Sequence, residues 1–108
     1  MWQKRQDRLE AALALLEADF RVQLIAELHR CARGEWGLFG QNKHLGNYGR
    51  DTQELDALGL EIQRVRDELG IVEPFALHDR LIRSRCRNTQ NDLGEARLAA
   101  LWLQELDT

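Results

Sequence analysis

The residue types that bind metals or act as nucleophiles are few in this chain and widely spaced. The histidines and cysteines are His29, Cys31, His44, His78 and Cys86. His29 and Cys31 lie two positions apart, so on a helix their side chains diverge by about 200°. No pair has the close spacing of a structural zinc site, and no base-orienting group stands at a recognised spacing. The sequence therefore predicts no metal, no cofactor and no catalytic residue, and we expect a protein that is not an enzyme.

Arginines gather in one short segment, where they could contact the phosphates of a nucleic acid. At 100° per residue, Arg80, Arg83 and Arg87 share one helix face, whereas Arg85 points elsewhere. Domains that bind nucleic acids are typically basic overall, but this chain has a net charge of −3. A nucleic-acid-associated regulator that uses these three arginines is thus an alternative function, and an exposed charged face is the simpler interpretation.

Five of the eight glycines and three aromatic residues lie between Gly34 and Gly49. Because each glycine costs roughly 1 kcal/mol in a helix, we predict a long structured loop over residues 34–50. The glycines match no phosphate-binding motif. The side chains that could line a small-ligand pocket in this loop are Trp36, Phe39, Asn42, His44 and Tyr48. The interpretation we favour is that Trp36, Leu38 and Phe39 instead plug the open end of a helical bundle.

The segment before the loop has the spacing of an amphipathic helix. Apolar residues recur at three- and four-residue steps from Leu9 to Leu28. A continuous helix from residue 5 to residue 33 would be about 43 Å long, which is more than a compact domain of this length suggests. We therefore expect a break or bend near Ala18 and Asp19. Gly34 should then cap the C-terminal end in the left-handed backbone conformation.

Helical spacing also continues after the loop. A second helix is predicted from Asp51, which forms a capping box with Glu54, to the stop at Gly70. A third should begin at Pro74 and run through residues 75–87, and a fourth should follow a polar run that ends at Asp92. The apolar residues on these predicted helices are Leu55, Leu58, Ile62, Val65 and Leu69, then Leu77, Leu81 and Ile82, then Leu98, Leu101, Trp102 and Leu106. No segment alternates with a period of two, so we predict an all-α, antiparallel bundle of four to five helices in one domain over residues 1–108.

The segment from residue 10 to residue 18 is apolar on nearly every side, which is more than a helix with one buried face requires. One face must either be enclosed within the bundle or be covered by a partner, which would be a second copy of the chain or a helix of another protein. The candidate interface residues are Leu13, Leu15 and Leu16. A protein-interaction module that binds through this helix is therefore the function that the sequence favours.

The chain has no apolar run of the roughly 20 residues that a membrane-spanning helix needs, and its N-terminal residues do not resemble a signal peptide. We accordingly expect a cytoplasmic protein that does not enter the membrane. In that compartment the two cysteines, which lie far apart in the sequence, should be reduced thiols.

Overall fold

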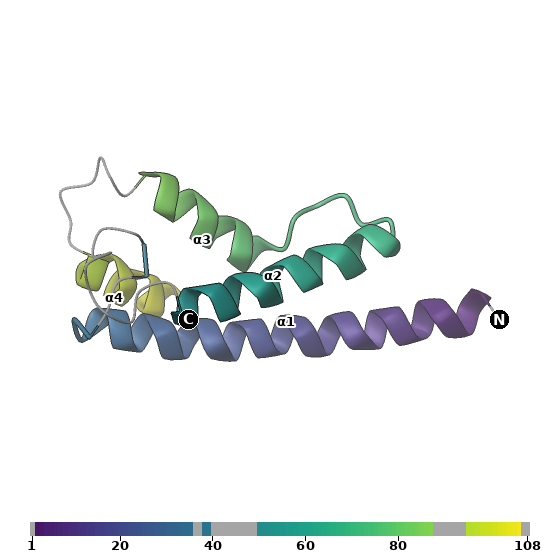
Figure 1. Cartoon of the computed structure of the whole chain (residues 1–108), viewed down its shortest axis with the longest axis horizontal. Helices are drawn as coiled ribbons and strands as arrows, with labels where there is room; N and C mark the ends of the chain where they lie inside the picture. Colours follow the sequence, from purple (N-terminus) through teal and green to yellow (C-terminus); the bar gives the residue numbers. More distant parts are fainter. Residues whose placement is uncertain (1, 36–37, 40–49, 88–94, 107–108) are drawn as a thin grey trace.

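The computed structural model describes residues 2–35, 38–39, 50–87 and 95–106. Within these ranges the protein is all-α and contains no strand. The described helices are α1 (Trp2–Ala32), α2 (Arg50–Glu68), α3 (Ala76–Arg87) and α4 (Glu95–Leu106). Helix α1 packs antiparallel to α2 along its middle and against α4 near its C-terminal end (Figure 1). The predicted all-α bundle is confirmed for this part of the chain, which contains the lower of the two expected numbers of helices.

The expected break in the first helix is wrong. Helix α1 continues through Ala18 and Asp19 without interruption and has 31 residues, or about 46 Å. The expectation assumed a nearly spherical domain, but the molecule measures 52 × 29 × 22 Å and its long axis accommodates the whole helix. Residues before and after the expected break pack in the core, as Leu16 and Phe20 show. Asp19 is exposed and does not interrupt the helix.

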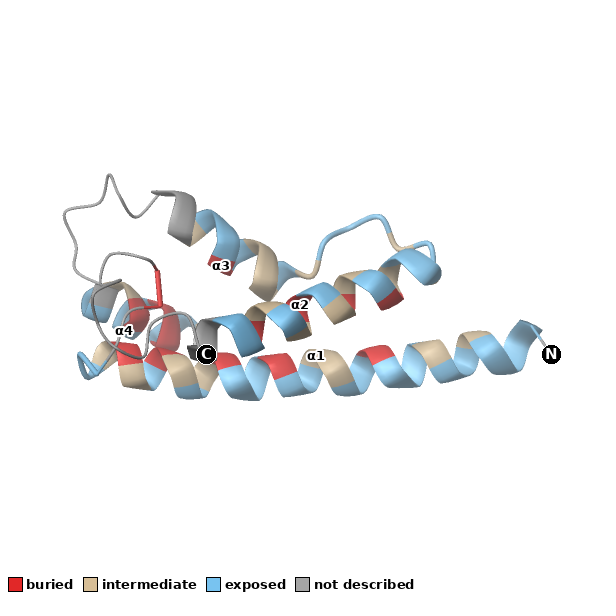
Figure 2. Ribbon diagram, viewed as in Figure 1, coloured by how far each residue is buried: buried red, intermediate tan, exposed pale blue. Residues whose placement is uncertain are grey.

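One apolar core connects the four helices. In Figure 2 the buried residues of α1 lie on the side that faces α2 and α4. Helix α3 joins the core through Leu81, and Phe75, the residue before α3, joins it through its ring, which meets Phe20 of α1 edge to face at 5.3 Å between centroids. The buried core residues are Leu13, Phe20, Leu24, Leu28, Cys31, Leu38, Phe39, Leu55, Ile62, Val65, Leu81, Ala99, Trp102 and Leu103.

Helices α1 and α2 are each followed, two residues after their last residue, by a glycine with a positive φ. Gly34 has φ +77° and Gly70 has φ +74°. At the first end, the Gly34 amide donates to the Cys31 carbonyl at 3.0 Å, and the Glu35 amide donates to the Arg30 carbonyl at 3.0 Å. This pair of bonds defines a Schellman motif, and the Gly70 and Ile71 amides form the same pair with Asp67 and Arg66. The predicted glycine caps are confirmed.

Some predicted starts of helices differ from the structure. Helix α3 begins at Ala76, and the Asp79 amide donates to the Phe75 carbonyl at 3.0 Å, so Phe75 is the N-cap and Pro74 precedes the helix. Helix α2 includes Asp51 in its first turn, one residue after its start at Arg50, so Asp51 is not the residue before the helix. The cap predicted at Asp92 lies outside the described residues.

Helices α2 and α3 approach each other closely at a glycine. The His78 ring lies over Gly59, where an added side-chain carbon would be 2.5 Å from the ring atoms Cε1 and Nδ1. The same ring meets Phe20 edge to face at 5.5 Å. On the next turn Leu81 is buried, whereas Ile82 is 44% exposed. Ile82 is one residue beyond the stripe that faces α2, and the rotation of 100° turns it toward solvent.

Candidate functional site

Helix α1 has a second apolar face, which lies opposite the face that packs in the core. Ala11, Leu15, Ala18 and Val22 are all exposed, and we call these four residues the back face. Their steps of four, three and four residues keep them within about 60° of one another around the helix axis, whereas the buried residues of α1 lie on the other side. Leu15 is 69% exposed and Val22 is 68% exposed. In Figure 2 the exposed residues follow the edge of α1 that is turned away from α2 and α4.

Polar and basic residues border the back face at both ends. Lys4 and Arg8 continue the same side of the helix toward the N-terminus, and His29 continues it toward the C-terminus, and all three are exposed. On one flank, Arg21 donates from Nη2 to the Leu106 carbonyl of α4 at 3.1 Å. The apolar stripe is therefore limited to about three turns with a charged rim, which is the usual arrangement of a protein-interaction surface.

The three interface residues predicted from the sequence have different environments. Leu13 is buried in the core at 7% exposure, and Leu16 packs partly buried against it. Only Leu15 faces solvent. Sequence reasoning did not identify Val22, although its position seven residues after Leu15, which is two helical turns, places it on the same face.

The short described part of the loop lies in the core. Leu38 is fully buried and Phe39 is 2% exposed, and the Phe39 ring stacks on Trp102 of α4 with 6.3 Å between centroids. For these two residues the expected plug at the end of the bundle is confirmed. Of the other loop residues expected to plug the bundle or line a pocket, Trp36, Asn42, His44 and Tyr48 lie outside the described residues.

A hollow of about 210 Å³ adjoins Phe39 and is also lined by Arg80, Trp102 and Glu105. Arg80 bonds to the Glu105 carboxylate, and its guanidinium carbon lies 4.6 Å above the Trp102 ring. The hydrogen bond from Arg80 lowers the pKa of Glu105 below its usual range. The indole Nε1 of Trp102 is buried and has no hydrogen-bond partner among the described residues.

The predicted arginine face is largely neutralised by neighbouring carboxylates. Arg80 pairs with Glu105, and Arg83 pairs with Asp79 on the preceding turn, with 2.9 Å between Nε and Oδ2. The side chain of Arg87 is outside the described part of the structure. These pairs reduce the positive potential that would attract a phosphate backbone.

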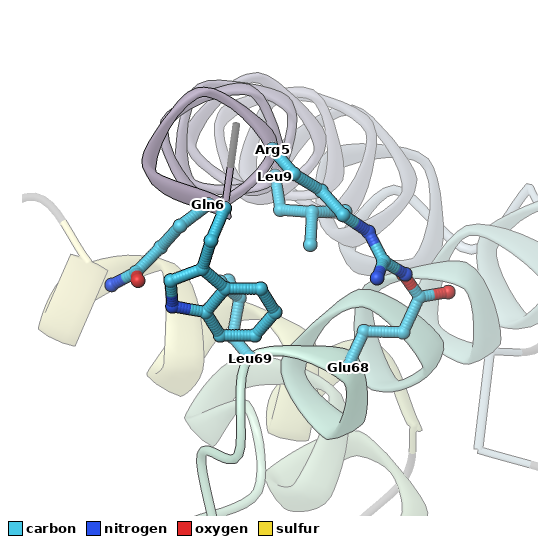
Figure 3. A pocket seen from close by; sticks show the side chains of 6 residues that line it. Arg5, Gln6, Leu9, Glu68 and Leu69 are labelled. Carbon is cyan, nitrogen blue, oxygen red and sulfur yellow. The ribbon is translucent and has the colours of Figure 1, made fainter.

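Two further hollows lie beside α2. One, of about 80 Å³, lies where the N-terminal end of α1 meets the C-terminal end of α2. In Figure 3 the Arg5 guanidinium faces the Glu68 carboxylate on one side of it, with 3.7 Å between the paired atoms, and Leu9 and Leu69 also line it. The other, of about 200 Å³, runs between α2 and α3 past Leu60, Phe75 and Ile82. All three hollows are smaller than the roughly 300 Å³ at which pockets for small-molecule ligands begin.

The described histidines and cysteine do not converge. His29 is exposed, Cys31 is a buried thiol, and His78 packs between Gly59 and Phe20. Nowhere in the described ranges do three or more histidine, cysteine or acidic side chains cluster as metal ligands do. None of the described helices has both the length and the apolar composition required to cross a membrane.

Comparisons with known proteins give no relative from which a role could be transferred. No protein-family model, curated protein sequence or solved structure matches the chain. The candidate site is therefore defined by its own geometry, in which Leu15 and Val22 place two exposed apolar side chains on one side of α1.

Proposed function

We propose that the protein is an interaction module that binds another protein chain through the back face of α1. The observation that supports this proposal is the exposure of Leu15 and Val22, at 69% and 68%, on one side of a well-packed helix. Single exposed apolar residues are common on protein surfaces, but two large ones on one stripe of small residues form a continuous patch. Because complete burial of a leucine or valine side chain gains about 1.5–3 kcal/mol, a partner that covers this patch gains substantial binding energy.

Helical geometry also supports this proposal. The core side of α1 is already occupied by α2 and α4, so the helix holds its shape without the back face. A stripe with an apolar residue at every third or fourth position is the pattern by which one helix binds another. The alanines at positions 11 and 18 leave room for a second helix to approach to about 8 Å.

The two alternative functions have less support. If the arginine face bound a nucleic acid, the Arg80–Glu105 and Arg83–Asp79 ion pairs would have to break. A small-ligand site beside Phe39 would have to use a hollow of about 210 Å³, where Arg80 and Glu105 already satisfy each other. The back face needs no such rearrangement.

Photo-crosslinking in the cells that make the protein tests this function. A photoreactive phenylalanine analogue at position 15 should give adducts with a protein chain, which can be this chain or another. The matched control is position 60, because Leu60 is 67% exposed and lies on α2. Adducts at position 15 but not at position 60 are expected. Adducts at position 60 alone, or at neither position, would contradict the proposal.

A further inference from the structure

We infer that the occupant of the back face is a second copy of this chain, packed antiparallel to the first around a two-fold axis. This inference rests on the proposed function and names its partner. It depends on the order of residue sizes along the back face, which is small at Ala11, large at Leu15, small at Ala18 and large at Val22. The four residues follow the alternating three- and four-residue spacing of a coiled-coil seam.

An antiparallel copy makes this order complementary to itself. When Leu15 lies opposite the partner's Ala18, Ala11 lies opposite the partner's Val22, because a step forward along one helix is a step backward along the other. The two-fold axis then repeats both layers, so all four layers combine one large residue with one small residue. Facing positions that combine large and small side chains fill the space between elements evenly.

A parallel copy would pack less well. Each residue would face its own counterpart, so two layers would contain paired large residues and two would contain only alanine, which leaves gaps. Lys4 and Arg8 would also face the same residues of the partner, which brings like charges together. In the antiparallel arrangement the two copies of Lys4 are 25 residues apart along the axis, or about 37 Å, where the screening of exposed charges is nearly complete.

Charges on one flank also fit the antiparallel arrangement. Arg21 and Glu10 are exposed on the same side of the back face. In the proposed register Arg21 is level with the partner's Glu10 to within about 3 Å along the axis, and the symmetry repeats the pair. Arg21 donates from one nitrogen to the Leu106 carbonyl, and a guanidinium has five N–H groups to donate. Rim pairs of this kind set orientation more than affinity.

The expected dimer is weak and reversible. About three turns of one helix bury less surface than a standard interface of about 1,600 Å², so we expect a dissociation constant in the micromolar range. Formation of the dimer leaves the contacts of α1 with α2 and α4 unchanged, because the back face points away from both helices.

The distance between two copies of position 4 separates the arrangements. We would attach a spin label to Lys4→Cys in a Cys86→Ser background, where the other thiol, Cys31, is buried. Pulsed electron resonance at high protein concentration should give a separation of about 37 Å between the two labelled helix positions, plus the length of the labels. A separation below about 20 Å would indicate a parallel pair, and an absence of dipolar coupling would indicate no pair; either result overturns the inference.

A size swap gives a second test. Leu15→Ala leaves two alanine layers, and Ala18→Leu crowds two leucines into each central layer, so each single variant should weaken the dimer by roughly 10-fold. The double variant restores one large and one small residue in each layer and should return to within about threefold of the original affinity. A double variant that is weaker than both single variants overturns the inference. If position 15 crosslinks to a different protein while this chain stays monomeric, the inference fails but the proposed function stands; if no crosslink forms, both fail.

Discussion

The crossing of α2 and α3 provides the most demanding test of the fold, through the substitution Gly59→Ala. A side-chain carbon at position 59 would lie 2.5 Å from Cε1 and Nδ1 of His78, well inside the roughly 3.5–4.0 Å that carbon contacts prefer. The ring cannot move away freely. Its side chain is only 12% exposed, its edge packs against Phe20, and its Nε2 lies 3.5 Å from the Asp56 carboxylate.

The size of the effect follows from two opposing contributions. Overpacking against His78 should cost about 1–3 kcal/mol, whereas alanine in a helix interior gains about 1 kcal/mol over glycine. Gly59→Ala should therefore lower the free energy of unfolding by up to about 2 kcal/mol. In a His78→Ala background the ring is absent, so the same substitution should raise the free energy of unfolding by about 1 kcal/mol.

Urea denaturation of the four proteins, followed by circular dichroism, measures this change of sign. The coupling between the two positions should be about 1–3 kcal/mol, as expected for residues in direct contact. A Gly59→Ala substitution that stabilises both backgrounds equally would refute the close approach of α2 and α3 at this point.

Three further predictions concern the end of the bundle and the helix caps. Phe39→Ala should lower the free energy of unfolding by about 3–5 kcal/mol, because Phe39 is buried against Trp102. Leu101→Ala, at a position 42% exposed, should lower it by less than half as much, and equal losses in urea denaturation would contradict the role of Phe39 as a plug of the bundle. Gly34→Ala should cost about 1 kcal/mol in the same assay, because alanine is strained at φ +77° and gains no contact within 4 Å; an unchanged midpoint would argue against the left-handed cap. Because Arg80 lowers the pKa of Glu105, their pair stabilises the fold above the unfolded pKa near 4.5, and this stabilisation is lost as the pH falls through the lower folded pKa. The difference in melting temperature between the original protein and Arg80→Gln should therefore shrink from about pH 7 to about pH 3, and a constant difference would contradict this.

The parts of the fold that follow from local rules could be predicted from the sequence. The stripe from Leu55 to Val65 indicated a packed helix, because three- and four-residue spacing puts apolar side chains on one side. Gly34 and Gly70 indicated helix ends, because few other residues adopt a positive φ without strain. The burial of Phe39 followed from the need to cover a large ring.

Other features depend on tertiary contacts that the sequence pattern does not specify. The continuity of α1 past Asp19 depends on α2 packing along the middle of the helix and α4 packing near its C-terminal end, which an estimate from a spherical domain cannot include. The spacing places Leu13 and Leu15 on different sides of the first helix, but the sequence does not specify that α2 and α4 cover the side of Leu13 and leave Leu15 exposed. Gly59 has the sequence context of any mid-helix glycine, and its role depends on His78 in the next helix.

Sedimentation equilibrium most directly tests whether the back face of α1 holds a second copy of the chain. The original protein should shift from monomer to dimer as its concentration rises, and the variant with Leu15→Lys and Val22→Lys should stay monomeric with unchanged helix content. The matched control is Leu60→Lys with Val72→Lys, which alters side chains 67% and 89% exposed on other elements and should dimerise like the original protein. A monomer at every concentration, or equal loss of dimer in both variants, would contradict the assignment of the back face.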